Sequence, residues 1–175
     1  MSSPSDIVIQ TPRLHLRKLR ADDLDTLAHM YNDEQVMRYI GSGGVRTRER
    51  ARQGLEAMIA KEARQGFGTW SAVLKSTGAM IGTCGFILWG IEGRKETEIS
   101  YLIARPYWGR GLATEAAGAV RDYGFGTLGC GRLISLIHEQ NHASKAVARK
   151  TGLTYEHDVE VKGMHVELHA IEKPH

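Results

Sequence analysis

In the first third of the chain, apolar residues recur first with the spacing of a β-strand and then with that of an α-helix. Apolar and polar residues alternate in RLHLRKL (13–19), as they do in a strand with one buried face. Asp22 then caps a stretch in which apolar residues recur at helical spacing, namely Leu24, Leu27, Ala28 and Tyr31. After the glycine-rich loop of residues 41–44, a second helix is predicted from about Thr47 to Gly66, a suitable C-terminal stop. We expect one strand followed by two helices.

From Trp70 onward the pattern is typical of strands. WSAVLKSTGAMIGTCGFIL predicts a hairpin that turns at residues 76–78 and continues in a long strand through Leu88. TEISYLIA (97–104) predicts a further strand. Because side chains alternate along a strand, it places Glu98, Ser100 and Leu102 on one face and Ile99, Tyr101 and Ile103 on the other.

The C-terminal part predicts two helices separated by a strand, then a hairpin. Pro106 ends the preceding strand, and an alanine-rich helix starts near Leu112. RLISLI is an apolar strand, and NHASKAVARKTGL is a helix capped by Asn141 and ended by Gly152. The tail alternates on both sides of Lys162, which predicts a final hairpin. With no repeat or linker visible, we expect a single α/β (α+β) domain over residues 1–175.

Composition narrows the class of protein. A chain of 175 residues with 42% hydrophobic residues has the size of one globular domain. No apolar stretch is long enough for a bilayer and no secretory signal is visible, so we expect a cytoplasmic protein that does not bind membranes. Cys84 and Cys130 are expected to be reduced thiols. A net charge of +3 is too mild to indicate nucleic acid but suits an anionic small molecule.

Two motif matches stand in the wrong structural context. HEQNH (138–142) fits the zinc pattern H-E-x-x-H, which requires both histidines on one helical face. Here His138 is expected at the exit of a strand and His142 at the start of a helix, so we expect no metal. GFGTLG (124–129) fits the dinucleotide pattern, but it follows a helix instead of a strand, so we interpret it as a helix stop and loop.

WGRGLATEA (108–116) does lie between a strand and a helix. Gly109 and Gly111 allow a sharp turn, and the amides of residues 110–114 then converge at the positive end of the helix dipole. Such a turn binds a phosphate group, and Arg110 adds positive charge. The alternative is a tight connection with a small-residue packing face. The turn alone leaves both interpretations open.

The sequence resembles the GCN5-related N-acetyltransferase (GNAT) superfamily, in its RimJ/RimL-like branch. The resemblance rests on TPRLHLRKLRADDLDTLAHMYNDEQVMRYI, ISYLIARPYWGRGLATEA and NHASKAVARKTGL, in this order, and it covers nearly the whole chain. It implies a mixed, mostly antiparallel sheet of six to seven strands, splayed in the middle and flanked by about four helices. It also implies acetyl-CoA as cosubstrate and no metal.

The resemblance assigns residues to the coenzyme. The signature [Q/R]-x-x-G-x-[G/A] corresponds to Trp108, Gly109, Arg110, Gly111, Leu112 and Ala113, whose amides, continued by Thr114, would hold the pyrophosphate. Trp108 departs from Gln or Arg, which puts a side-chain contact in doubt. Backbone groups of the splayed strand would pair with the pantetheine arm, at Tyr101, Leu102, Ile103, Ala104 and Arg105. Asn141 and Ser144 match the N-x-x-S motif of the branch, and they also suit a helix cap and a solvent-facing serine.

Direct acetyl transfer needs a base, a group that polarises the thioester carbonyl and an acid for the thiolate. We assign these roles to Glu98, to the amide of Tyr101 or Leu102, and to Ser144, with Glu96 as rival base. Both glutamates also suit exposed strand positions.

The expected function is acetyl-CoA-dependent N-acetyl transfer to a primary amine by a monomer or homodimer; the alternative is a non-catalytic acyl-CoA-binding or sensing domain. The acceptor would lie between the loop of residues 41–45 and the final hairpin. Near pH 7 an α-amine is neutral roughly several-hundred-fold more often than lysine, which favours peptide N-termini, while antibiotics and metabolites stay open.

Overall fold

A computed structural model describes residues 6–174. One eight-stranded sheet forms the centre, in the order β1-β2-β3-β4-β5-β6-β8-β7. Only β5 and β6 pair in parallel, so the mixed, mostly antiparallel sheet expected from the sequence is confirmed. The strands are β1 (Ile7–Gln10), β2 (Leu14–Arg17), β3 (Thr69–Leu74), β4 (Met80–Ile91), β5 (Arg94–Ile103), β6 (Arg132–Ile137), β7 (Thr154–Val161) and β8 (Met164–Glu172).

Five α-helices lie within the described residues: α1 (Leu24–Tyr31), α2 (Glu34–Met37), α3 (Arg48–Gln65), α4 (Leu112–Gly126) and α5 (His142–Lys150). The sequence predicted several of their ends, but Asp22 does not cap α1. It lies inside a 3-10 turn, Ala21–Asp23, before this helix and pairs with Arg20 at 3.3 Å. The side chains of Thr47 and Asn141 accept hydrogen bonds from the first turns of α3 and α5, and α3 stops at Gly66 with φ +80°.

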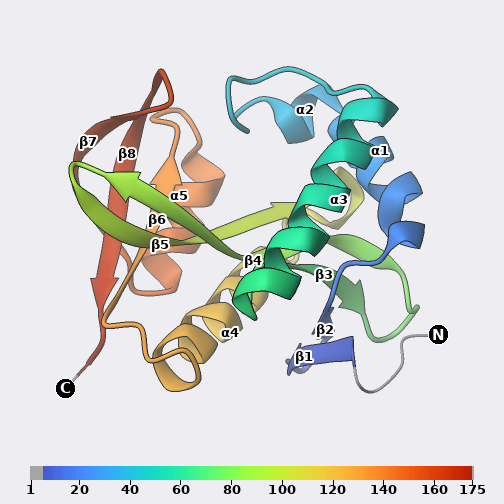
Figure 1. The fold of residues 1–175 in the computed structure, drawn as a ribbon, viewed down its shortest axis with the longest axis horizontal. Coiled ribbons are helices and arrows are strands. Elements are labelled where there is room, and N and C mark those ends of the chain that lie inside the picture. Colours follow the sequence, from blue (N-terminus) through green and yellow to red (C-terminus); the bar gives the residue numbers. More distant parts are fainter. Residues whose placement is uncertain (1–5, 175) are drawn as a thin grey trace.

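Two of three apolar clusters in the described residues lie on opposite faces of β5. Ile99 and Ile103 belong to the cluster that contains Ala116 and Val120 of α4, and Tyr101 packs against it. Leu102 packs instead against the cluster of α1 and α3. The predicted alternation along β5 is therefore confirmed. Figure 1 shows β6, β7, β8 and α5 leaning away from β1–β3, with the long strands β4 and β5 running between the two groups.

Some elements differ from the expectation. β1 and α2 were not predicted, because each is only four residues long and shows no period. With β1 and the full hairpins, the sheet has eight strands in place of six to seven. Gly124 and Gly126 lie inside the last turns of α4 and not in a loop. At Gly124 an added Cβ would lie 3.0 Å from Leu133, so this glycine serves close packing.

Candidate active site

β5 and β6 separate after a single paired position. Glu98 pairs with Ile134, and a regular parallel ladder would continue at Ser100 and Leu136. Instead, the Leu136 amide donates to Oε1 of Glu98 across 3.4 Å. Oγ of Ser135 donates to the carbonyl oxygen of Ile99 across 3.0 Å. Two side chains thus take the bonds that the ladder loses, and the predicted splay of the sheet is confirmed.

Alternation along β5 decides which backbone groups face this fork. The Ala104 amide donates to Ile81 of β4 across 2.8 Å, and the Ile99 carbonyl points the other way, toward Ser135. Backbone groups alternate sides in an antiparallel pair, so those of Tyr101 and Ile103 face the fork. The amide of Ala104, expected to bind pantetheine, is used within the sheet. By the same alternation Leu102 faces β4, which leaves the Tyr101 amide as the candidate for polarising a carbonyl.

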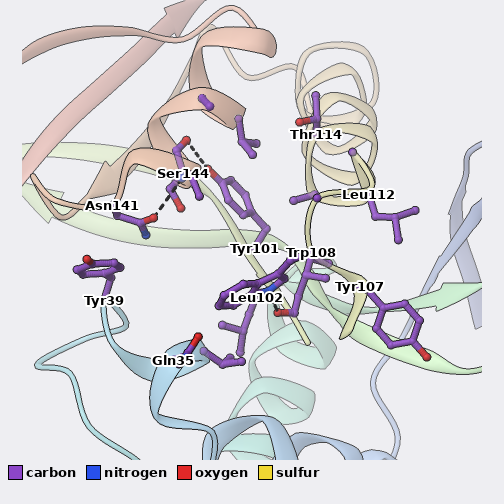
Figure 2. A pocket seen from close by; sticks show the side chains of 18 of the residues that line it. Gln35, Tyr39, Tyr101, Leu102, Tyr107, Trp108, Leu112, Thr114, Asn141 and Ser144 are labelled. Carbon is purple, nitrogen blue, oxygen red and sulfur yellow. Dashed lines mark hydrogen bonds between the residues drawn. The ribbon is translucent and has the colours of Figure 1, made fainter. Parts of the chain in front are cut away.

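A cavity of about 570 Å³ opens at the fork. β5, the start of α4, α5 and α2 contribute its walls (Figure 2). Eleven of the predicted residues line it: Tyr101, Leu102, Ile103, Trp108, Gly109, Gly111, Leu112, Ala113, Thr114, Asn141 and Ser144. The charged residues in the lining are two cations, Arg38 and Lys150, so the cavity suits an anionic ligand.

Four predicted residues do not line the cavity. Arg105 begins a single 3-10 turn, Arg105–Tyr107, and pairs with Asp33 at 3.1 Å. Arg110 lies with Cζ 5.5 Å from the centroid of the Tyr107 ring. Ala104 and Glu98 complete this group.

Conversely, Gln35, Arg38 and Tyr39, which lie in and just after α2, line the cavity and were not predicted. The sequence contained one signal for α2, a possible N-cap residue at Asp33. In the structure the Asp33 side chain does accept from the Gln35 amide, across 2.9 Å.

The start of α4 has the geometry expected of an anion-binding turn. Gly109 and Gly111 both have φ +73°, and Gly111 is the N-cap residue of the 15-residue helix. Glycine adopts this left-handed conformation without steric cost, and the amides that follow are free of intrahelical partners. They lie at the positive end of the helix dipole and border the cavity.

Trp108, which stands where the family signature has Gln or Arg, makes a side-chain contact within the protein. Its Nε1 donates to the carbonyl oxygen of Ile103 across 2.6 Å. The side chain is nonetheless 46% exposed and lines the cavity. The indole therefore occupies one fork-facing carbonyl and leaves an apolar surface at the mouth of the cavity.

Glu98 and Glu96 are both buried, so the interpretation as exposed strand charges is wrong. Nε1 of Trp89 donates to Oε2 of Glu98 across 2.6 Å. Burial raises the pKa of Glu98 to about 7, against the opposing effect of the bonds from Trp89 and Leu136. Glu96 instead pairs with Arg132 at 3.3 Å, in a cluster with two further glutamates. Of the two carboxylates, only Glu98 lies at the fork.

Tyr101, Asn141 and Ser144 meet at the start of α5 (Figure 2). The Tyr101 hydroxyl donates to the carbonyl oxygen of Ser144 across 3.0 Å, and burial raises the pKa of this phenol. Oδ1 of Asn141 accepts from the Ser144 amide across 3.2 Å, which confirms the predicted cap. Both bonds use backbone atoms of Ser144, so its hydroxyl is not needed for either.

The histidines of HEQNH are placed as the sequence predicts. His138 follows β6 and His142 is the first residue of α5, so the helical spacing that zinc ligands need is not present. The His138 ring lies 5.0 Å from that of Tyr39, centroid to centroid. Among residues 6–174, no group of three or more His, Cys, Asp or Glu side chains is arranged to hold a metal ion. None of the helices in this range is long and apolar enough to cross a membrane.

A split sheet whose fork opens onto a glycine turn at a helix start is the arrangement that the sequence resemblance to acetyltransferases implied. Residues 13–154 match the family model described as Acetyltransferase (GNAT) domain. The chain therefore belongs to the GNAT acetyltransferase family.

Relatives and solved structures agree with this assignment. The uncharacterized protein YkkB of Bacillus subtilis is 37% identical over 83% of this chain and 84% of its own length. The uncharacterized N-acetyltransferase p20 of Bacillus licheniformis is 31% identical over 78% of this chain and 76% of its own length. The crystal structure of an acetyltransferase from Agrobacterium tumefaciens is 27% identical, with a TM-score of 0.80 over 98% of this chain and 96% of that chain.

One structure with the same fold contains a ligand. RimL, described as a ribosomal L7/L12 α-N-protein acetyltransferase, was solved in complex with coenzyme A. It is 19% identical, with a TM-score of 0.75 over 95% of this chain and 97% of that chain. At this identity the likeness concerns the fold alone.

Proposed function

We propose that the protein transfers the acetyl group of acetyl-CoA to a primary amine by direct attack, in the manner of the RimJ/RimL-like branch. The observation that carries this proposal is the shared cavity: the fork-facing backbone of Tyr101 and the amides at the start of α4 open onto the same space. The pyrophosphate binds at Gly109–Thr114. The pantetheine arm pairs as an added strand with the backbone of Tyr101 and with the amide of Ile103, whose carbonyl is already bonded to Trp108. RimL, which has the same fold, was solved in complex with coenzyme A, and this supports coenzyme A as the ligand class.

The charges around the cavity fit this coenzyme. Arg38 and Lys150 line the cavity and no carboxylate does, so the phosphates of acetyl-CoA meet no like charge in the lining. Trp108 offers an apolar surface to the pantetheine arm at the mouth. These features supply binding and orientation, while the chemistry of the thioester belongs to the cosubstrate.

Glu98 is the proposed general base. Its pKa of about 7 lies near the operating pH, where a base combines an adequate ionised fraction with adequate basicity. Because Glu98 is buried beside the cavity without lining it, a bridging water carries the amine proton to its carboxylate. Glu96 is held by Arg132 and is the weaker candidate.

The remaining steps complete the transfer. The neutral amine nitrogen attacks the thioester carbon while the Tyr101 amide donates to the carbonyl oxygen, which becomes negatively charged. The C–N bond forms, the C–S bond breaks, and Glu98 receives the surplus amine proton through water. The Ser144 hydroxyl protonates the thiolate and is reprotonated from solvent. The products are the acetylated amine and free coenzyme A.

The acceptor is proposed to be a peptide α-amine. An α-amine has a pKa of about 7.7 to 8.0, against about 10.4 for lysine, so a single weak base suffices for it. The RimL likeness points in the same direction. We place the acceptor between the loop of residues 41–45 and the β7–β8 hairpin. We also propose a single cytoplasmic domain over residues 1–175, acting as a monomer or homodimer without nucleic acid or membrane.

Thiol release tests the proposal. The protein is mixed with acetyl-CoA and, in separate reactions, with peptides that carry free N-termini, lysine-containing peptides blocked at the N-terminus, and small amines. We expect coenzyme A to accumulate fastest with free N-termini. Coenzyme binding without thiol release for any amine would instead identify a non-catalytic acyl-CoA-binding domain.

A further inference from the structure

Arg13 joins the N-terminal segment to the turn that begins α4. Nη1 of Arg13 donates to the carbonyl oxygen of Arg110 across 2.9 Å. Nε of the same guanidinium meets Oε2 of Glu115, in the first turn of α4, at 2.6 Å. One planar group therefore spans the turn, from the residue before Gly111 to the helix after it.

Glu115 is held from the same segment by two further bonds. Its Oε1 accepts from Oγ1 of Thr11 across 2.6 Å and from the Arg13 amide across 2.8 Å. Although burial acts to raise the pKa of Glu115, the bonds from Thr11 and Arg13 lower it overall, so the carboxylate is ionised. The Glu115 side chain is 15% exposed, so solvent competes little with this arrangement.

The contact to Arg110 fixes the orientation of the next amide. The carbonyl of Arg110 and the N–H of Gly111 belong to one planar peptide group and point in opposite directions. Arg13 holds the carbonyl, so the Gly111 N–H is directed away from Arg13. Gly111 lines the cavity, and a Cβ added there would lie 3.6 Å from Nη2 of Arg13. An amide cradle binds a phosphate only when several N–H groups converge on it.

We infer that Arg13 is a positioning residue for the coenzyme: it sets the Arg110–Gly111 peptide plane, with Glu115 as its anchor, so that the turn presents converging amides to the pyrophosphate. This inference rests on the proposed function, because it takes that turn as the pyrophosphate site. Arg13 acts through geometry and not through charge, since Glu115 neutralises it at 2.6 Å.

Two acetyl donors separate this role from a general structural one. Acetyl-CoA carries the pyrophosphate, whereas S-acetylpantetheine presents the same thioester without it. In Arg13→Ala the KM for acetyl-CoA should rise about ten- to hundredfold with little change in kcat, because the pyrophosphate contacts bind the ground state and the transition state equally. The kcat/KM with S-acetylpantetheine should stay at the wild-type value. An equal loss with both donors overturns the inference.

Glu115→Gln tests whether Glu115 weakens coenzyme binding through its charge or strengthens it by holding Arg13. Removing a negative charge beside an anion site should strengthen anion binding if charge alone matters. If Glu115 anchors Arg13, the same substitution weakens binding of coenzyme A. The double variant Arg13→Ala/Glu115→Gln should then bind coenzyme A as tightly as whichever single variant has the lower affinity. Arg13→Lys keeps the charge but loses the two-directional contact, so it should bind nearly as weakly as Arg13→Ala.

Binding of free coenzyme A, followed by calorimetry, does not depend on turnover. The matched control is Arg52→Ala, since Arg52 is 45% exposed, against 49% for Arg13, and also pairs with glutamates, Glu49 and Glu56. Its coenzyme affinity should equal that of the wild type. If the wild type binds coenzyme A without transferring acetyl groups, only the proposed catalysis fails. If Arg13→Ala is folded and binds coenzyme A like the wild type, only this inference fails, and a wild type that does not bind it overturns both.

Discussion

Nε1 of Trp89 on β4 donates to Oε2 of Glu98 on β5 across 2.6 Å. The centroid of the same indole ring lies 4.9 Å from Nζ of Lys162, in the turn of the β7–β8 hairpin. Leu136 of β6 supplies the second donor to Glu98. The carboxylate at the fork is thus tied to two neighbouring strands and, through Trp89, to the hairpin beside the proposed acceptor site.

Trp89→Phe should shift the pH dependence of the reaction. The indole N–H stabilises the ionised form of Glu98, so its loss raises the pKa of Glu98 above its value of about 7. The base form then appears at higher pH. We expect the acidic limb of kcat/KM to move upward by about one pH unit, which corresponds to ~1.4 kcal/mol for a hydrogen bond to a charged group.

Leu88→Ala is the control for this profile. Leu88 neighbours Trp89 on β4, is 43% exposed, and makes no contact assigned to the reaction. Its limb should coincide with that of the wild type. A folded Trp89→Phe protein with an unshifted limb would show that this bond does not tune the base.

Glu98→Gln should lower turnover strongly. If the carboxylate accepts the amine proton in the transition state, kcat falls by about 10² to 10⁴ while acetyl-CoA affinity is nearly preserved. The loss should shrink as pH rises, because the amine then deprotonates unaided. Single-turnover rates and coenzyme binding measured on one sample separate the two effects. If Glu98→Gln kept wild-type turnover at every pH, Glu98 would not be the base, and its role would be limited to its hydrogen bonds at the fork.

The same substitution should change how stability depends on pH. The pKa of Glu98 rises from 4.5 to about 7 on folding, so the folded protein holds a proton that the unfolded chain loses first. Stability from this group is present below about pH 4.5 and is lost as pH rises through 7, by up to about 3 kcal/mol. Relative to the wild type, Glu98→Gln should therefore gain stability between pH 5 and pH 8.

Urea denaturation at these two pH values measures the difference. Glu96→Gln breaks the ion pair with Arg132 and should lose stability at both. An identical wild-type and Glu98→Gln dependence on pH would mean that burial does not perturb this carboxyl.

Local patterns predicted the fold better than the site. The alternation of apolar and polar residues predicted strand β5 and its two faces. Thr47 and Asn141, which cap α3 and α5, marked the starts of these helices. The glycine turn was placed correctly because Gly109 and Gly111 act through backbone conformation, which is a local property.

Contacts between distant segments could not be predicted in this way. Arg13 and Glu115 are 102 residues apart, and nothing near either one indicates the other. The sequence left open whether Glu96 and Glu98 were exposed strand charges, whereas in the structure Arg132 and Leu136 of β6 donate to the two buried carboxylates. Which polar strand face is buried depends on what packs against it, and a single strand does not carry that information.

Gly111→Val should abolish the thermal stabilisation that acetyl-CoA gives to the wild type. Valine at φ +73° is strained, so the turn changes conformation and its amides no longer converge on the pyrophosphate. Thermal unfolding with and without acetyl-CoA measures the loss, and NAD should give no shift in either protein. Gly78→Val is the matched control, because Gly78 has φ +70° but lies in the β3–β4 turn, away from the cavity. It should unfold at lower temperature yet keep its response to acetyl-CoA.

Ser144→Ala is a clean test of the proposed acid. The cap to Asn141 and the bond from Tyr101 use the amide and carbonyl of Ser144, so alanine retains both and removes only the hydroxyl. The free thiol has a pKa of about 8.5, so its thiolate needs less help from an acid as pH rises. We expect kcat to fall about tenfold near pH 7, with coenzyme binding unchanged and the defect shrinking toward pH 9. Tyr101→Phe, which loses the phenol and keeps the backbone amide, should bind coenzyme A normally and show no such pH dependence. A Ser144→Ala defect that stays constant from pH 7 to pH 9 would assign the hydroxyl to binding geometry instead of proton transfer.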